Sequence, residues 1–274
     1  MGELAHARPG NGTEADGLAE RIDAGLRARA VPERAAGEKA YLKSALTHYG
    51  TSVPATRAAV REALAGSRLG HDELVDVVGR LWDVPVHERR AAAVELLETH
   101  ADLLGVADAP LLERLLRASR TWALVDRLAA SVVGPVTERD GAWGVVLDRW
   151  VTDDDFWLRR SALLAHLLPL RAGGGDWERF TRYADATLDE TEFFVRKAIG
   201  WVLRDTGRTR PDLVYAWLLP RAARASGVTV REAVKPLTDV QRDAVLAARG
   251  GPSSRGRRAP SSAVRSGTRG GAPA

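Results

Sequence analysis

Residues 192–203 read EFFVRKAIGWVL, a segment in which a basic residue stands two positions before an alanine. The same order recurs in HERRAAAVELL at 87–97, WLRRSALLAHLL at 157–168 and TVREAVKPL at 229–237. The alanines at 162, 198 and 233 are 36 and 35 residues apart, and the 70 residues between the alanines at 92 and 162 leave room for one more copy, in TWALVDRLAA. This spacing indicates a repeat of about 35 residues.

Each unit between Val86 and Leu237 has the pattern of two short helices. Apolar residues recur at intervals of three and four, and glycine or proline interrupts them every dozen or so residues. No segment shows the alternation of a strand. We therefore predict an all-α fold, a right-handed α-solenoid of HEAT-like antiparallel helix pairs whose stack curves around a concave face. A chance pattern in a sequence rich in Ala, Leu and Arg is the alternative.

The composition limits the chemistry. The chain of 274 residues has no cysteine, which excludes disulfides, thiolate nucleophiles and cysteine-ligated zinc. Its six histidines form no H-x-x-x-H pair, so we expect no metal site and no cofactor. No apolar run approaches eighteen residues, which predicts a cytoplasmic protein without a membrane partner.

The positive charge is concentrated at one end of the chain. Residues 250–274 hold five of the 40 basic residues and no acidic residue, which leaves 35 basic against 36 acidic residues in the rest of the chain. We predict that residues 1–14 and 250–274 are disordered and that residues 15–249 form one folded domain. DNA binding by this domain would require its arginines to be gathered on one face.

Aligning the repeats places Trp122, Asp126, Arg160 and Trp201 on one stripe of neighbouring helices. A carboxylate and a guanidinium without partners would be costly in a dry core, so this stripe is predicted on the concave surface. An Asp126–Arg160 ion pair that braces adjacent repeats, with the tryptophans as packing, is an equally weighted alternative.

Further cations and one tyrosine fall near this predicted face. Interleaved cations and aromatic rings suit a phosphate backbone with accessible sugars, although many exposed arginines are merely solvated. The candidates for DNA binding are Tyr41, Lys43, Arg159, Arg196, Lys197, Arg204, Arg231 and Lys235, with Arg57 close to them in the sequence.

Five segments between about Glu38 and Lys235 resemble the DNA alkylation repair family of HEAT-like repeat DNA glycosylases (the AlkD-like group). They are KAYLKSALTHYGTSVPATR, LWDVPVHERRAAAVELL, TWALVDRLAASVVG, DDDFWLRRSALLAHLLPL and EFFVRKAIGWVLRDTGRTRPDLVYAWL. Ala123, Pro236 and the arginine-rich end depart from the family pattern but leave its site motifs intact.

The resemblance implies a site and an activity. The family's W-x-x-x-D motif maps onto Trp122 and Asp126, its W-L-x-R arginine onto Arg160, its A-I-G-W tryptophan onto Trp201, and its x-Y-x-K aromatic onto Tyr41. Members of the family cradle duplex DNA and excise N3- and N7-alkylated purines without a deep base-flipping pocket. The implied protein is a monomeric, cofactor-free DNA glycosylase whose partner is duplex DNA with alkylated purines, nucleoid-associated when bound.

These residue types suit the excision of a cationic purine. The base leaves as a neutral molecule, so no strong general acid is required, and Asp126 can stabilise the oxocarbenium ion and orient water. Trp122 and Trp201 can stack on sugar and lesion, and Arg160 is expected to hold a phosphate. Three alternatives stay open: a self-resistance glycosylase for bulky adducts of a DNA-alkylating natural product, a non-catalytic helical-repeat scaffold, and a DNA-binding protein without glycosylase activity.

Overall fold

A computed structural model describes residues 11–250 of the chain, and all regular elements in this range are helical. The only strand-like contact there is an isolated bridge between Thr47 and Val86. The predicted all-α fold is confirmed.

The predicted repeat is also confirmed, because five helix pairs follow one another along the chain. Their second helices begin 34 to 37 residues apart. The pairs are α4 (His71–Asp83) with α5 (His87–Thr99), α6 (Ala109–Ser119) with α7 (Trp122–Arg127), α9 (Trp143–Trp150) with α10 (Phe156–Leu164), α12 (Trp177–Ala186) with α13 (Phe193–Gly207), and α14 (Pro211–Leu218) with α15 (Gly227–Ala233).

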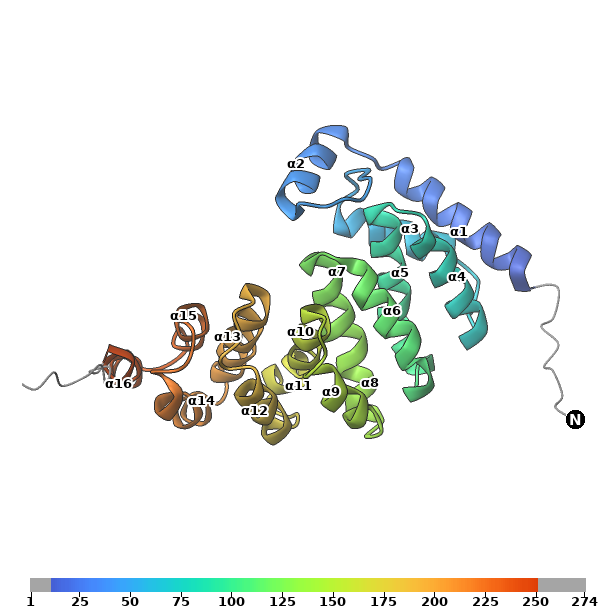
Figure 1. The fold of residues 1–274 in the computed structure, drawn as a ribbon. Coiled ribbons are helices and arrows are strands. Elements are labelled where there is room, and N and C mark those ends of the chain that lie inside the picture. Colours follow the sequence, from blue (N-terminus) through green and yellow to red (C-terminus); the bar gives the residue numbers. More distant parts are fainter. Residues whose placement is uncertain (1–10, 251–274) are drawn as a thin grey trace, which may run out of the picture.

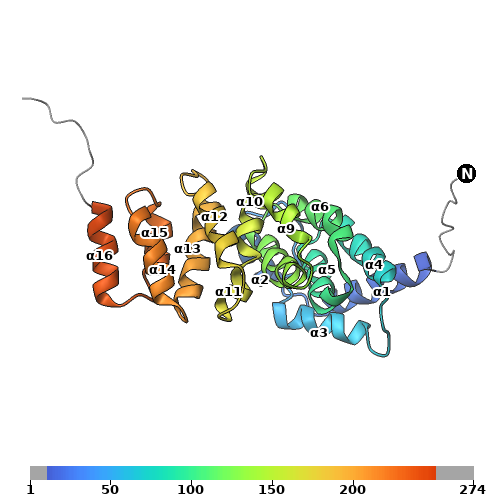
Figure 2. The ribbon, with the colours of Figure 1, turned by 90° about the horizontal axis from the view of Figure 1, so that it is seen from below.

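The pairs succeed one another along a curved row, which Figures 1 and 2 show from two directions. Helix α13 packs against α10 on one side and against α15 on the other. The helices bury the stripes that the sequence pattern predicts. In α6, for example, Leu112, Leu115 and Leu116 are fully buried, three and four residues apart.

Helices outside the pairs complete the fold. Helix α1 (Asn11–Arg27) packs on α3 (Val53–Ala63), α4 and α5 at one end of the row, and α16 (Asp239–Gly250) lies at the other end (Figure 1). Helix α2 (Pro32–Leu42) projects from the row and buries none of its residues. Short segments fill the turns: α8 (Gly134–Arg139), α11 (Leu167–Arg171), the 3₁₀ turns Ala101–Leu103, Val106–Asp108 and Leu219–Arg221, and the π-helical turn η3 (Leu128–Val133).

The turn η3 joins α7 directly to α8. Pro135 in the first turn of α8 has no backbone N–H to donate to the preceding turn, and a π-turn accommodates such a break without ending the helix. Gly134 is required at this junction, since a Cβ there would lie 2.8 Å from the carbonyl oxygen of Ala165. Only Leu124 and Val125 of α7 are buried, so Trp122 and Asp126 stay partly exposed, whereas most of the π-turn η3 is buried in the core.

One expected boundary differs by a few residues from the helix in the structure. Helix α1 begins at Asn11, so residues 11–14, predicted to be disordered, are helical, since Glu14 stands in the first turn of an otherwise helix-compatible segment. Helix α16 ends at Gly250, where the tail was predicted to start. The other residues of the two predicted disordered ends lie outside the described range. No helix in residues 11–250 has the length and apolar character needed to cross a membrane.

Candidate functional site

The residues predicted on one stripe surround a hollow of about 430 Å³ on the curved row. Four helices contribute to it: α2, α7, α10 and α13. The lining side chains are Tyr41, Trp122, Asp126, Arg160, Phe193, Phe194, Lys197, Trp201 and Arg204. The structure therefore brings together all four residues that the repeat register grouped.

Asp126 and Arg160 form a two-pronged ion pair across α7 and α10. The Nε and Nη2 atoms of Arg160 donate to the two carboxylate oxygens of Asp126, each at 2.8 Å. The Nη1 atom of Arg160 donates to the carbonyl oxygen of Phe194 on α13. One guanidinium thus joins three consecutive repeats and fixes the plane of the carboxylate.

In this structure the guanidinium of Arg160 is engaged within the protein, and its expected contact with a phosphate stays a prediction. The residue is only 2% exposed, and all three of its nitrogens donate within the protein. The ion pair that the sequence left open as an alternative is the one observed, because the arginine stem from α10 reaches the carboxylate before it reaches solvent. The tryptophans, in contrast, line the hollow as well as pack against the core.

Burial raises the pKa of the Asp126 carboxyl above its ordinary value, and the hydrogen bonds and charge of Arg160 offset part of that rise. The Asp126 side chain keeps 13% of its surface exposed, on the side of the hollow. A carboxylate in this position can meet positive charge on a ligand with little screening by water.

Aromatic rings form the other walls. The rings of Tyr41 and Trp122 meet edge to face, with centroids 5.9 Å apart. Trp201 is held by a hydrogen bond of 3.2 Å from its Nε1 to the carboxylate of Asp205. Phe193 and Phe194, which sequence reasoning missed, add two more rings. Their signal was present in the EFFVRK motif, where they open α13 one turn before Lys197.

Tyr41 depends on a loop that anchors α2. Gly50 has a φ of +80°, and a Cβ there would lie 2.1 Å from the carbonyl oxygen of Val31. The buried carboxylate of Glu88 accepts hydrogen bonds from the backbone N–H groups of Tyr49, at 2.9 Å, and Gly50, at 2.6 Å. This loop holds α2 so that Tyr41, 74% exposed, stands over Trp122.

Three side chains around this loop have metal-ligand chemistry, one each from α2, the loop and α5. Ligand atoms of Glu38, His48 and Glu88 lie within 4.8 Å of one another. Both oxygens of Glu88 already accept backbone hydrogen bonds, and Glu38 accepts one from Arg34. These carboxylates therefore have structural roles that need no ion.

Three of the predicted DNA-binding cations converge on one carboxylate. Glu232 of α15 accepts from Lys197 at 2.7 Å, from Lys235 at 2.9 Å, and from Arg204. Burial disfavours its charged form, but the hydrogen bonds from the two lysines and the charge of Arg204 lower the pKa of Glu232 to about 2. Arg204 also donates to the carboxylate of Asp205, at 3.2 Å, so these three cations share two carboxylates.

Of the other cations predicted to bind DNA, two have partners within the described part of the protein and two do not. Arg159 pairs with Glu190 at 2.9 Å, and Arg196 donates to the carbonyl oxygen of Glu190, so both brace loops. Lys43 and Arg231 are exposed, and within residues 11–250 they form no ion pair. Outside the candidate set, Arg57 pairs with Glu95 at 3.2 Å.

We expect Glu232→Gln to tighten binding of undamaged duplex DNA severalfold at low salt, because it releases Lys197 and Lys235 from a competing carboxylate and leaves Arg204 with Asp205 alone. The variant should also unfold at lower urea concentration, since it loses charge-assisted hydrogen bonds. Fluorescence-anisotropy titrations and urea unfolding measure the two effects. Glu178→Gln, an acid-to-amide change at a glutamate with no ion pair among the described residues, serves as the control. Weaker binding by Glu232→Gln would show that Glu232 orders the cations for DNA.

Comparisons with known proteins identify the family of the chain. The sequence profile of a family described as "DNA alkylation repair enzyme" matches residues 22–237. Among solved structures, the chain is similar to one described as "Predicted DNA alkylation repair enzyme from Enterococcus faecalis", with a TM-score of 0.68 and 21% sequence identity. The likeness covers 77% of this chain and 98% of that chain, and at this identity it shows a shared fold. A search of curated proteins finds no match.

Proposed function

Since the chain belongs to the family of DNA alkylation repair enzymes, we propose that it is a DNA glycosylase that hydrolyses the N-glycosidic bond of cationic N3- or N7-alkylated purines in duplex DNA. The observation that supports this most is the Asp126 carboxylate, fixed by Arg160 at the edge of an aromatic-lined hollow.

The carboxylate fits the charge that develops during excision. Alkylation makes the purine cationic, and it leaves as a neutral base while positive charge moves to C1′ of the deoxyribose. Asp126 stabilises that charge and orients the water that attacks C1′. Because the leaving base needs no proton from the protein, no strong general acid has to lie in the hollow.

Arg160 acts through Asp126. Its two parallel hydrogen bonds hold the carboxylate in one orientation, and its charge favours the ionised form against the effect of burial. A fixed carboxylate does not have to reorganise when the oxocarbenium ion forms, and such preorganisation lowers the barrier. Arg160 is therefore a positioning residue.

The aromatic rings supply binding surfaces for the sugar and the cationic base. Each contact between a desolvated cation and a tryptophan face contributes about 1–2 kcal/mol. Tyr41 and Trp122 face the hollow from α2 and α7, and Trp201 faces it from α13. The hollow lies on a curved surface and one wall is the exposed Tyr41, so a large alkyl group can extend outward.

We expect release of N7-methylguanine and of a bulky N3-adenine adduct from matched duplexes at rates that depend weakly on the size of the alkyl group. Uracil, which is uncharged, should be a poor substrate, because no residue is placed to protonate it as it leaves. The measurement is free base released in single-turnover reactions. Efficient uracil release, or rejection of every bulky adduct, would contradict an open, charge-driven site.

A second candidate function is favoured by the openness of the same hollow. A glycosylase that protects its host from a DNA-alkylating natural product needs room for a bulky adduct. In the same assay, release of the bulky adduct much faster than release of N7-methylguanine would favour this self-resistance role.

A further inference from the structure

A second hollow, of about 930 Å³, adjoins the candidate site along the chain. The role inferred for it rests on the proposed function. Residues 44–46, just after Tyr41, form part of its lining. Arg120 and Thr121, just before Trp122, form another part. Two of the three segments that carry aromatic rings into the candidate site therefore continue into this second hollow.

Five arginines line the second hollow together with a single carboxylate, that of Glu113. We call this hollow the arginine groove. Its arginines are Arg90, Arg114, Arg117, Arg120 and Arg149.

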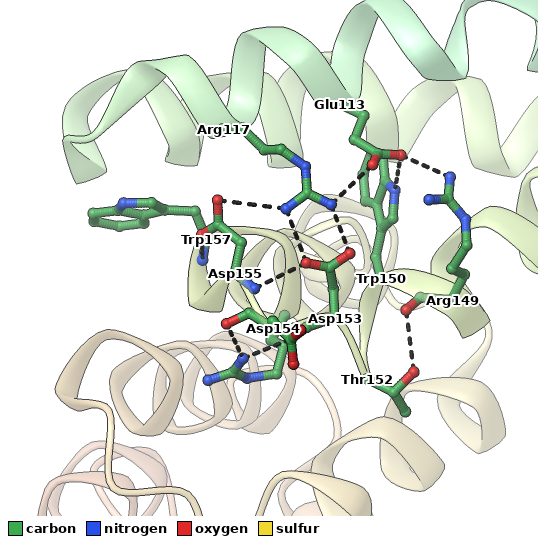
Figure 3. A network of polar contacts seen from close by, with 10 residues as sticks. Glu113, Arg117, Arg149, Trp150, Thr152, Asp153, Asp154, Asp155 and Trp157 are labelled. Atoms are coloured by element: carbon green, nitrogen blue, oxygen red, sulfur yellow. Dashed lines mark hydrogen bonds and ion pairs between the residues drawn. The ribbon is translucent and has the colours of Figure 1, made fainter.

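A network of ion pairs fixes the floor of the arginine groove (Figure 3). Glu113 accepts from Arg117 at 2.9 Å and from Arg149 at 2.7 Å, and Arg117 also donates to Asp153 at 2.9 and 2.6 Å. Burial opposes the charge of Glu113, yet hydrogen bonds from Arg149, Arg117 and Trp150 lower the pKa of its carboxyl. Glu113 is thus ionised at neutral pH, and its one charge is shared between two arginines.

The other three arginines form no ion pair shorter than 3.9 Å among the described residues. Arg90 donates to the backbone oxygens of Trp82, at 3.2 Å, and Ala118, at 2.9 Å. The nearest carboxylate oxygen to Arg114 is that of Asp83, at 3.9 Å. Arg120 is exposed and has no ion pair within residues 11–250.

The backbone at Arg120 gives a second reason to assign a function to the arginine groove. Arg120 ends α6 with a φ of +48°, a left-handed conformation that glycine or asparagine adopts at lower cost. The sequence places a strained arginine, unpaired within residues 11–250, at this corner, two residues before Trp122. Strained residues of this kind concentrate where a ligand is held.

We propose that the arginine groove binds the sugar–phosphate backbone of the duplex on one side of the lesion. The five arginines outnumber the carboxylates beside them, those of Glu113, Asp83, Asp153 and Asp155, and this excess suits a polyanion with regularly spaced phosphates. A strand whose damaged nucleotide lies between Tyr41 and Trp122 can continue past residues 44–46 and Arg120 without leaving the protein surface. The arginine groove therefore sets the position of the flanking DNA, while the candidate site acts on the lesion.

The test compares the full-length protein with Arg114→Gln/Arg120→Asn, in which asparagine suits the left-handed position. Matched controls are Arg68→Gln and Arg208→Gln, at exposed arginines outside the arginine groove that form no ion pair in the described part of the chain. Binding of an undamaged duplex is measured by anisotropy over a range of salt concentrations, with melting curves to verify folding.

If the arginine groove binds DNA, the double variant should bind undamaged duplex about tenfold more weakly than the full-length protein. The slope of log affinity against log salt concentration should become less steep by about two, and the control variants should change little. With a lesion-bearing duplex truncated on one side, the deficit should vanish for one truncation and persist for the other. Equal losses in variant and controls, or an unchanged slope, would overturn the proposal.

Two further outcomes separate this proposal from the proposed function. Weaker, less salt-dependent binding by the double variant, with no base release even by the unmodified protein, would support the arginine groove and reject the glycosylase assignment. Unchanged DNA binding together with arginine-dependent binding of a polyglutamate peptide would assign the arginine groove to an acidic protein partner instead.

Discussion

Asp126→Asn is expected to lower the single-turnover rate of base release from an N7-alkylguanine duplex by at least about tenfold, or about 1.4 kcal/mol of barrier. Asparagine keeps the shape of the side chain and one acceptor for Arg160, but it removes the charge that faces C1′. Affinity for the damaged duplex should stay the same, since the aromatic walls and the cations are untouched.

The control is Asp185→Asn, which removes a carboxylate paired with Arg221 on the far helices of the same domain. It should release base at the rate of the unmodified protein. If Asp126→Asn releases base equally fast, Asp126 has no part in the chemistry, and the scaffold interpretation gains support.

Arg160→Met is expected to lower the free energy of unfolding by about 3 kcal/mol or more, because it leaves the buried Asp126 carboxylate without its partner. Methionine retains the apolar bulk of the arginine stem, so the loss reports the ion pair rather than a cavity. The measurement is urea unfolding at neutral pH.

The double variant Asp126→Asn/Arg160→Met serves as the test of that cause. Once no charge remains to be buried, it should recover a large part of the lost stability. It should remain inactive, since the carboxylate is absent. Purely additive losses would show that Arg160 stabilises the fold through Phe194 alone.

The sequence predicted the fold and the main cluster for one physical reason. The repeat length sets which helix follows which, and the helical period sets which residues share a face, so Trp122, Asp126 and Trp201 could be grouped without coordinates. The same logic could not decide between a phosphate and Asp126 as the partner of Arg160. That choice depends on how far α10 lies from α7, a packing distance that no periodicity encodes.

Features built by contacts between distant segments were missed. The loop that holds Tyr41 over Trp122 depends on Glu88 reaching the backbone of Gly50, and the two segments are 38 residues apart. After α7 the π-turn shifts which residues face the core, and heptad or 3.6-residue sequence patterns do not show such a shift. The division of the cations into paired and free side chains depends on which carboxylates packing brings near, as at Glu232.

Hydrolysis of the N-glycosidic bond can be tested by product analysis with mass spectrometry. The protein is incubated with an N7-methylguanine duplex in isotopically labelled water. A glycosylase releases free N7-methylguanine and leaves a labelled oxygen at C1′ of the abasic deoxyribose, and we expect both products. Unmodified guanine restored in intact DNA, or a duplex left unchanged under conditions in which it is bound, would contradict this hydrolysis.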